Sequence, residues 1–382
     1  MSGRPELIDA DAHVNPPPTF WDDYLPSHLV SKAPKIEAGG PGEGHDWVVF
    51  EGTRKPLGIL AALGGRKVED YKAAGRESEL RRGSWEAASR LQDMETDGVD
   101  TAVLYGGGPL GTGDNELYLA SFDAYNRWLA DFCKHSPQRL VGVAYLPMQD
   151  VDQSVQMLKD AAKRGLKGVN IPAFPQSANG ISGGGFAAQV LALTGDPDGP
   201  RQYDDPQFDP FWQAAVDHDM AVTIHLGARV ARPGQNRFLP NLVMTKVSMA
   251  EPIAIMIFGG VFERFPTLRF GSIESGVGWF AWMAEYMDAI WLNQRHWLKN
   301  ELKNPPSHYM DQNVYGSFIR DPTGVANFHK VGGRNIMWST DYPHSETTWP
   351  NSQANLDKHF AGIPEADRRQ IVCENARRFY AL

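Results

Sequence analysis

Short apolar stretches alternate along most of this chain with segments whose apolar residues recur every three or four positions. The first pattern is typical of strands buried on both faces, and the second of amphipathic helices. Eight strands are predicted, at Leu7–Asp11, Val99–Tyr105, Leu140–Leu146, Gly168–Ile171, Met220–Leu226, Leu268–Ile273, Val314–Phe318 and Asn335–Thr340. Helices are expected beside them, at Ser84–Asp97, Leu117–Ser136, Asp152–Arg164, Phe208–Asp217, Glu251–Phe262, Val277–Trp297, Thr323–Val331 and Pro364–Leu382.

Eight strand–helix repeats over 382 residues favour an α/β fold of the (β/α)8, or TIM, barrel type over an open sheet. We expect a single domain that covers residues 1–382. Residues 35–85 interrupt the alternation after the first strand, with a cluster of glycines and a segment, DWVVFE, that predicts a small hairpin. A long irregular insertion at this place is typical of an active-site lid.

Composition and charge narrow the class of partner. With 42% hydrophobic and 22% charged residues the chain can bury a sizeable core, and its net charge of −9 argues against nucleic acid or an anionic membrane surface. We expect no secretory leader, and the longest apolar run, Ile253–Phe262, is too short to span a bilayer. Cys133 and Cys373 lie far apart in sequence and are expected to be reduced, which predicts a cytoplasmic protein.

Candidate chemistry gathers where the predicted strands end, which is where a (β/α)8 barrel carries its functional groups. Imidazoles and carboxylates that could bind a divalent metal follow the first, fifth, sixth and eighth strands: Asp11, His13, His225, Glu274, Asp341 and His344. Such a set suits a zinc-like ion with open coordination positions. Singly, His225 could be a core histidine and Asp341 a helix cap. Their coincidence at the strand ends favours a metal site.

Other candidates are less specific. Arg229, Arg232 and Arg320 each follow a strand and could bind a carboxylate, although solvated loop arginines are the simpler interpretation. The aromatic residues of the segment Trp279–Trp297 could line a pocket or a subunit contact, but their helical spacing makes packing on the barrel the default.

The chemical residues belong to the segments IDADAHV, TIHLG, GGVFERFPTLRF followed by ESGVGW, WSTDYPHSETTWPNS and CENARRFYAL. In the order and spacing of these segments, the chain resembles the metal-dependent amidohydrolase superfamily, in the branch of aminocarboxymuconate-semialdehyde decarboxylase and γ-resorcylate decarboxylase. The resemblance implies a distorted (β/α)8 barrel and one divalent ion, zinc first and manganese as an alternative. It also implies the metal ligands, which would be Asp11, His13, His225 and Asp341.

Two positions depart from this branch. Asp11-x-His13 stands where many members have His-x-His, and a carboxylate there favours harder metals. Glu274-Ser275-Gly276 stands where the decarboxylases usually carry His followed by glycines. Glu274 is expected to act as a base, to orient a ligand histidine or to contact the substrate, and its structural alternative is a cap of helix Val277–Trp297. In superfamily members with two metals, a modified lysine at the end of the fourth strand bridges them. Here Lys167 lies at the beginning of that strand, so the resemblance implies one metal.

The resemblance predicts a metal-dependent, non-oxidative decarboxylase of a small aromatic or unsaturated carboxylic acid, with Asp341 moving the proton. The alternative is a hydrolase of an amide, lactone or C–C bond, in which Asp341 or Glu274 would deprotonate a metal-bound water. A binding protein with a decayed site is disfavoured by ligands at four strand ends. Arg229, Arg320 and His344 are expected to contact the substrate, and the assembly is expected to be a homodimer or larger homo-oligomer.

Overall fold

The computed structural model describes residues 6–17, 19–106, 109–175, 201–226, 238–330 and 333–382. Eight parallel strands form one sheet in the order β1-β5-β6-β7-β8-β9-β10-β11. Their bounds are Ile8–Val14, Thr101–Gly106, Leu140–Tyr145, Gly168–Ile171, Ala221–His225, Phe270–Ile273, Val314–Phe318 and Ile336–Trp338. Each coincides with a predicted strand, so the predicted (β/α)8 barrel is confirmed.

The barrel closes between its first and last strands. The amide of Asp341, just after β11, donates to the carbonyl oxygen of Asp11 in β1 at 3.0 Å, and the amide of His13 donates to the carbonyl oxygen of Tyr342 at 2.5 Å. These two bonds place the segment after β11 beside the middle of β1. Asp341 therefore shares one edge of the barrel with Asp11 and His13, from which it is more than 300 residues away along the chain.

Helices surround the sheet, because each strand is apolar on both faces and needs cover outside the barrel. The α-helices are α1 to α4 at Phe20–Tyr24, Ala87–Asp97, Asn115–Cys133 and Val151–Lys163, α6 to α9 at Asp209–Asp217, Phe238–Val247, Ala250–Phe258 and Val261–Arg264, and α10 to α15 at Phe280–Leu298, Pro306–Asn313, Pro322–Ala326, Ser352–His359, Glu365–Arg369 and Asn375–Tyr380. A π-helical turn, Gln370–Glu374, joins α14 to α15 inside the single helix predicted there.

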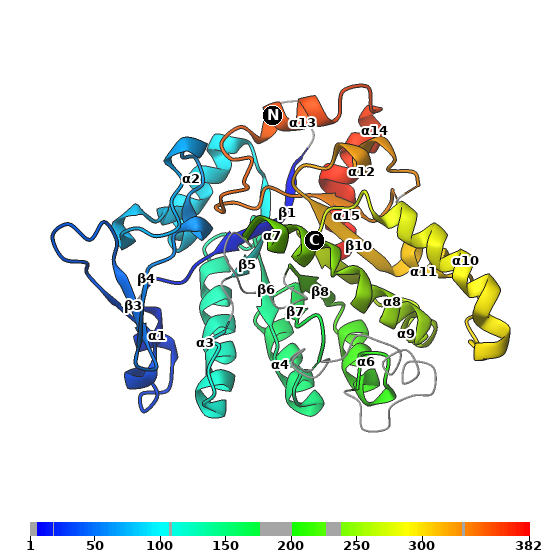
Figure 1. Cartoon of the computed structure of the whole chain (residues 1–382), viewed down its shortest axis with the longest axis horizontal. Helices are drawn as coiled ribbons and strands as arrows, with labels where there is room; N and C mark the ends of the chain where they lie inside the picture. Colours follow the sequence, from blue (N-terminus) through cyan, green and yellow to red (C-terminus); the bar gives the residue numbers. More distant parts are fainter. Residues whose placement is uncertain (1–5, 18, 107–108, 176–200, 227–237, 331–332) are drawn as a thin grey trace.

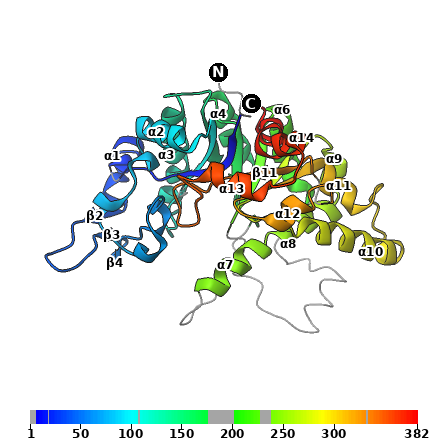
Figure 2. The ribbon, with the colours of Figure 1, turned by 90° about the horizontal axis from the view of Figure 1, so that it is seen from above.

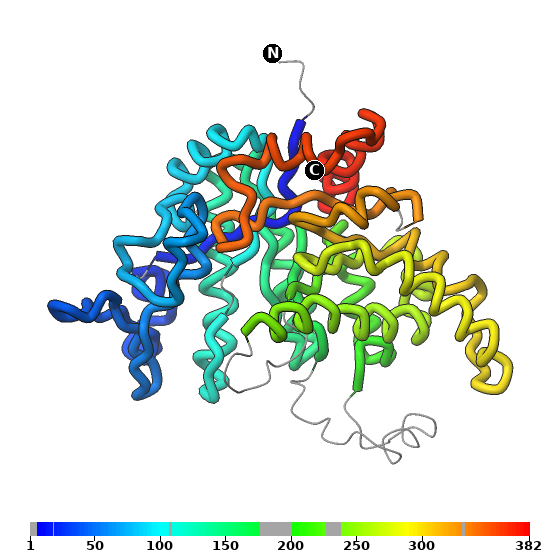
Figure 3. Tube along the Cα trace, turned by 45° about the horizontal axis from the view of Figure 1, so that its top comes forward, coloured from blue at the N-terminus to red at the C-terminus, as the bar shows by residue number. Residues whose placement is uncertain are grey.

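The insertion after β1 forms a small antiparallel sheet of β2 (Lys35–Glu37), β3 (Trp47–Phe50) and β4 (Thr53–Pro56). It contains the predicted hairpin and one further strand. Beyond it the chain returns to the barrel, where the amides of Gly64 and Ser345 bond to the carbonyls of Pro343 and Leu60. The insertion is thus attached to the loop that follows β11. Figures 1 and 3 show the insertion and α10 extending to opposite sides of the barrel.

One helix of the wall that was not predicted bears on the site. α7 was not predicted; it precedes α8 and projects from the barrel in Figure 2. Together α7 and α8 make a 21-residue helical stretch, Phe238–Phe258, that by length and composition could cross a bilayer, which the shorter predicted run could not. Core helices meet the same criterion, and Ile253 and Met256 of α8 are fully buried. α8 is therefore part of the barrel wall.

Candidate metal centre and active site

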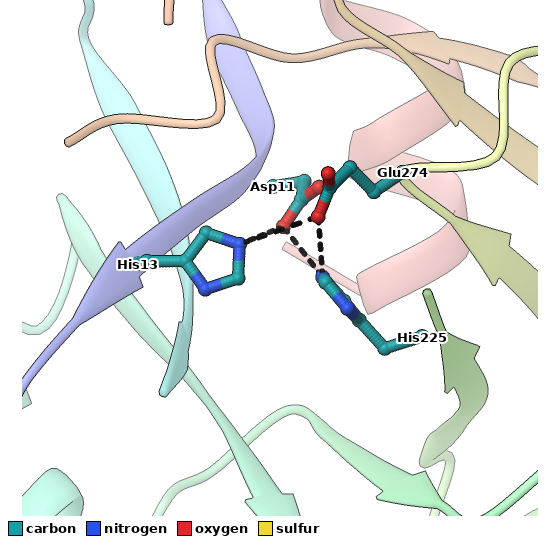
Figure 4. Close-up of side chains that lie close together, drawn as sticks. All are labelled: Asp11, His13, His225 and Glu274. Carbon is teal, nitrogen blue, oxygen red and sulfur yellow. Dashed lines mark hydrogen bonds and ion pairs between the residues drawn. The ribbon is translucent and has the colours of Figure 1, made fainter. Parts of the chain in front are cut away.

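Four elements bring the predicted ligands together. β1 continues past its predicted end and carries both Asp11 and His13, with a register shift against β5 between Asp9 and Ala12. His225 is the last residue of β8, Glu274 follows β9, and Asp341 lies three residues beyond β11. Figure 4 shows the side chains of Asp11, His13, His225 and Glu274 converging on one point.

The distances within this cluster are typical of ligand atoms that bind the same metal ion. Nε2 of His13 lies 3.3 Å from Oδ1 of Asp11 and 3.2 Å from Oδ1 of Asp341. Nε2 of His225 lies 3.3 Å from the same oxygen of Asp11. Ligand atoms about 2.1 Å from one ion at right angles would be about 3 Å apart. Asp11, His13, His225 and Glu274 offer ligand atoms within 4.8 Å of one another, and so do His13, Glu274, Asp341 and His344, so each group has a spacing that suits one small divalent cation.

Burial provides an independent test of that fit. Oδ2 of Asp11, Nε2 of His13 and Oδ1 of Asp341 are buried, and none makes a regular hydrogen bond among the described residues. A buried carboxylate or imidazole left in this state is costly unless something else binds it. The residues present fit a metal ion, because a cation at the cluster would satisfy all three atoms.

The electrostatics of the cluster also favour a positive charge. Burial opposes ionisation of Asp11, but the imidazoles of His225 and His13 outweigh it and hold the pKa of Asp11 below its usual range. Burial likewise opposes protonation of His13, yet the close carboxylates of Asp11 and Asp341 raise its pKa to about 10. Without a metal, the carboxylates thus draw a proton onto the ring, in the place where a metal would supply the charge.

Glu274 is a member of the same cluster rather than a helix cap. Its Oε2 lies 3.9 Å from Nε2 of His13 and 3.7 Å from Nε2 of His225. α10 begins six residues later, at Phe280, and it is Asp321 that accepts from the amides of Val277 and Gly278 before it. The alternative of a cap is therefore wrong, and Glu274 faces the predicted metal ligands.

The backbone at Glu274 and Asp341 is strained. Both have positive φ, 59° and 57°, a region that residues other than glycine seldom adopt. Burial, followed by repulsion from Asp341 and Asp11, raises the pKa of Glu274 well above its usual range. Strain and an unfavourable charge are typical of functional positions, where the surrounding structure holds the side chain in place.

His344 supports Asp341. Its Nδ1 lies 2.8 Å from Oδ1 of Asp341, and its ring stacks on that of His13 with centroids 3.9 Å apart. Burial and the neighbouring His13 lower the pKa of His344, so the ring is neutral at pH 7. A neutral ring can orient the aspartate through Nδ1. It carries no positive charge that would repel a metal ion bound at the cluster.

Behind the cluster, a second layer of polar groups fixes β1 against the segment after β11. The carboxylate of Asp9 accepts from the amide of Thr340 at 2.8 Å and from its hydroxyl. Arg90, which is 1% exposed, donates to the carbonyl oxygens of His13 and Gly83. These groups set the backbone that carries His13 and Asp341.

A cavity of about 820 Å³ opens above the cluster. Its floor holds His13, His225, Glu274, Asp341 and His344. The rest of the described lining is mainly apolar or aromatic and includes Leu60 and Ala61 of the insertion, Tyr118, Phe122, Tyr145, Leu146, Ile171, Pro172, Phe174, Phe238 and Leu242. The cavity suits a mainly apolar molecule whose polar end reaches the cluster.

Of the three predicted arginines, the structure describes Arg320 alone. The guanidinium of Arg320 donates to the carbonyl oxygens of Glu346 and Thr347, and Arg320 is not among the described residues that line the cavity. Arg229, Arg232 and the glycine-rich segment 181–185 lie outside the described residues. Lys167 precedes β7, at the end of the strand away from the cluster.

Sequence reasoning missed Lys246, on α7. Its Nζ lies 2.9 Å from Oε2 of Glu346 and 3.9 Å from Oε1 of Glu274. Burial opposes its charge, but the hydrogen bond to Glu346 and the charge of Glu274 raise the pKa of Lys246. No motif marks this lysine, and only the position of an unpredicted helix brings it to the site.

Comparison with known proteins identifies the family and agrees with the fold. The amidohydrolase family model matches residues 8–382. The γ-resorcylate decarboxylase of Rhizobium radiobacter is 26% identical over 313 residues, which cover 77% of this chain and 86% of that protein. The 2-amino-3-carboxymuconate-6-semialdehyde decarboxylase of Dictyostelium discoideum is 26% identical over 312 residues, which cover 78% and 77%.

Solved structures share the whole fold at low identity. An amidohydrolase from Mycobacterium avium subsp. paratuberculosis K-10 superposes with a TM-score of 0.73 and 18% identity over 99% of both chains. A dihydroxybenzoic acid decarboxylase from Polaromonas sp. JS666, which contains manganese and the inhibitor 2-nitroresorcinol, superposes with a TM-score of 0.66 and 18% identity over 99% of this chain and 98% of its own. Both matches agree with the barrel described above.

Proposed function

This chain belongs to the amidohydrolase family, and from that premise we propose that it is a metal-dependent, non-oxidative decarboxylase of a small aromatic or unsaturated carboxylic acid. The observation that carries the proposal is a buried metal-ligand cluster at the floor of an apolar cavity. The curated relatives named above are decarboxylases, and they cover most of the chain. A cavity with apolar walls and a polar floor supports a substrate with an unsaturated body and a carboxylate end.

Asp11, His13, His225 and Asp341 would hold the ion, and one ion per chain is proposed. A divalent ion bound there supplies positive charge to the substrate carboxylate and to a neighbouring oxygen. Zinc or manganese fits a set of two imidazoles and two carboxylates. Manganese in the Polaromonas decarboxylase supports the second choice.

Asp341 is proposed as the proton carrier. In decarboxylation the bond between the substrate carbon and its carboxylate breaks, CO₂ leaves, and the carbon keeps the electron pair and takes up a proton. Asp341 faces the cavity and is oriented by His344, so its carboxyl group can deliver that proton. Glu274 is proposed as a second acid–base group, and His344 as a substrate contact, because both line the same floor.

Product analysis tests this function. Metal-loaded protein is incubated with 2,6-dihydroxybenzoate, 5-carboxyvanillate and related aromatic acids, and in parallel with aromatic lactones and amides. We expect CO₂ and the decarboxylated product from at least one acid, and a loss of about 10²-fold or more in Asp341→Asn. The exposed Asp70→Asn is the matched control. Acid release from a lactone or amide without CO₂ from any acid would instead establish the hydrolase.

We also propose that the chain forms a homodimer or larger homo-oligomer in the cytoplasm. α10 exposes Trp282, Tyr286, Leu292, Trp297 and Leu298, and the rings of Trp282 and Tyr286 stack on one another. Large apolar side chains gathered on one helix support a subunit contact. Light scattering during size-exclusion chromatography should show the assembly, and Trp282→Glu should reduce its mass to that of a monomer if α10 forms the contact. The two buried, free cysteines are compatible with a reducing compartment.

A further inference from the structure

The described lining of the cavity carries three carboxylates and neither lysine nor arginine. The carboxylates belong to Glu274, Asp341 and Glu346. If the substrate is a carboxylic acid, as the proposed function requires, it enters as an anion and meets negative charge on the cavity wall. A divalent ion bound at the floor would offset the charge there, and a second cation near Glu346 would offset the repulsion at the wall.

α7 places one lysine next to that wall. Phe238, Leu242 and Lys246 are spaced four residues apart and thus lie on one face of this helix. Phe238 and Leu242 line the cavity, so the same face brings Lys246 to its edge. Lys246 itself is not among the described residues that line the cavity, but its side chain is 28% exposed and contacts Glu346, which does line it.

The contacts of Lys246 join two of the three carboxylates. Its ammonium group binds Oε2 of Glu346 at 2.9 Å and lies 3.9 Å from Oε1 of Glu274. The other oxygen of Glu274, Oε2, faces the imidazoles of His13 and His225. Glu274 therefore lies between the metal-ligand cluster and the lysine, with one oxygen toward each.

We propose that Lys246 is the residue that makes this cavity specific for an anionic substrate. It positions Glu274 through Oε1 and supplies the positive charge that offsets the carboxylate of Glu346. It acts on the substrate through the charge of the wall, so it is a positioning and specificity-determining residue. This inference rests on the proposed function for its substrate class, but the electrostatic role itself does not depend on turnover.

The rival interpretation is a surface ion pair that only attaches α7 to the loop after β11. Surface pairs of this kind contribute little to stability and leave ligand charge preference unchanged. Two variants separate the interpretations, because Lys246→Met and Glu346→Gln both break the pair. If the pair only attaches α7, the two substitutions should change ligand affinity in the same direction. If the lysine acts through its charge on the wall, the two substitutions should change the affinity for an anionic ligand in opposite directions.

The first measurement is ligand affinity by calorimetry on manganese-loaded protein, with 2,6-dihydroxybenzoate and its neutral methyl ester as probes. A unit charge about 6 Å away at an effective dielectric between those of protein and water changes affinity about tenfold. We expect Lys246→Met to weaken binding of 2,6-dihydroxybenzoate about tenfold and binding of the ester less than twofold. Glu346→Gln should strengthen binding of the acid. Lys246→Arg should retain wild-type affinity, and the effects should shrink as salt rises.

The second measurement is Mn²⁺ affinity of metal-free protein, which requires no substrate. Removing a cation near the cluster should tighten Mn²⁺ binding several-fold in Lys246→Met, and removing an anion should weaken it in Glu346→Gln. Equal shifts in the two variants, or unchanged Mn²⁺ affinity with equal loss for acid and ester, would overturn the proposal. If wild-type protein binds neither probe, the substrate class of the proposed function is refuted, while the Mn²⁺ series still decides the role of Lys246.

Discussion

Replacing Glu274 with glutamine separates chemistry from folding at this site. The side chain is 5% exposed and its backbone is held at positive φ, so glutamine, of nearly the same shape, should keep the conformation. The change replaces a carboxyl group, in a cluster that also contains Asp11 and Asp341, with an amide that cannot ionise. Because α10 begins at Phe280, no helix-capping contribution is lost with it.

Activity and stability should then move in opposite directions. If Glu274 takes part in proton transfer, turnover should fall about 10²-fold, which corresponds to about 2.7 kcal/mol of transition-state stabilisation. The stability of the metal-free protein should rise instead. Burial and repulsion from Asp341 and Asp11 raise the pKa of Glu274 above its ordinary value of 4.5, so the folded chain keeps a proton that the unfolded chain has released.

The sign and the pH window follow from that difference. Below pH 4.5 the carboxyl group is protonated in both states and contributes no difference. As the pH rises above 4.5, the wild-type protein loses up to about 1.4 kcal/mol of unfolding free energy per pH unit through this group, and the glutamine variant does not. Between pH 5 and pH 7 the unfolding free energy of the variant should therefore rise relative to that of wild type.

Urea unfolding of both metal-free proteins at several pH values measures the second effect, and steady-state kinetics of the metal-loaded proteins measures the first. Asp70→Asn is the control, since it removes an exposed carboxylate away from the cluster. Parallel stability curves for wild type and Glu274→Gln would show that Glu274 is not held under electrostatic strain. Unchanged turnover would leave Asp341 as the acid–base group.

Three further predictions concern the metal and the layer behind it. His225→Ala should lose metal and activity together, as measured by elemental analysis and turnover, and full metal content would show that His225 is no ligand. Protein purified without chelator should hold close to one ion per chain, whereas two ions would contradict the placement of Lys167 before β7. Arg90→Met should cost about 3 kcal/mol in denaturant unfolding, because the carbonyls of His13 and Gly83 lose a charged donor. A loss below about 1 kcal/mol would show that water replaces the guanidinium.

The sequence by itself determined the barrel and the identity of most of the cluster. Eight apolar strands in alternation with amphipathic helices leave few other ways to bury both faces of a parallel sheet. Since the strand ends of a barrel meet at one face, Asp11, His13, His225, Glu274 and Asp341 could be placed together before any contact was known. The local pattern alone carried this information, because the period of a strand fixes which side chains share its face.

Only the tertiary structure decided how these groups are charged and held. The strained backbone at Glu274, the donation from Arg90 to the His13 carbonyl and the approach of Lys246 each depend on segments far apart in sequence. Lys246 lies on a helix with no clear periodic signal, and its partners follow β9 and β11. Electrostatic coupling falls off with distance in space and not along the chain, so the charge balance of this site is set by packing and not by any motif.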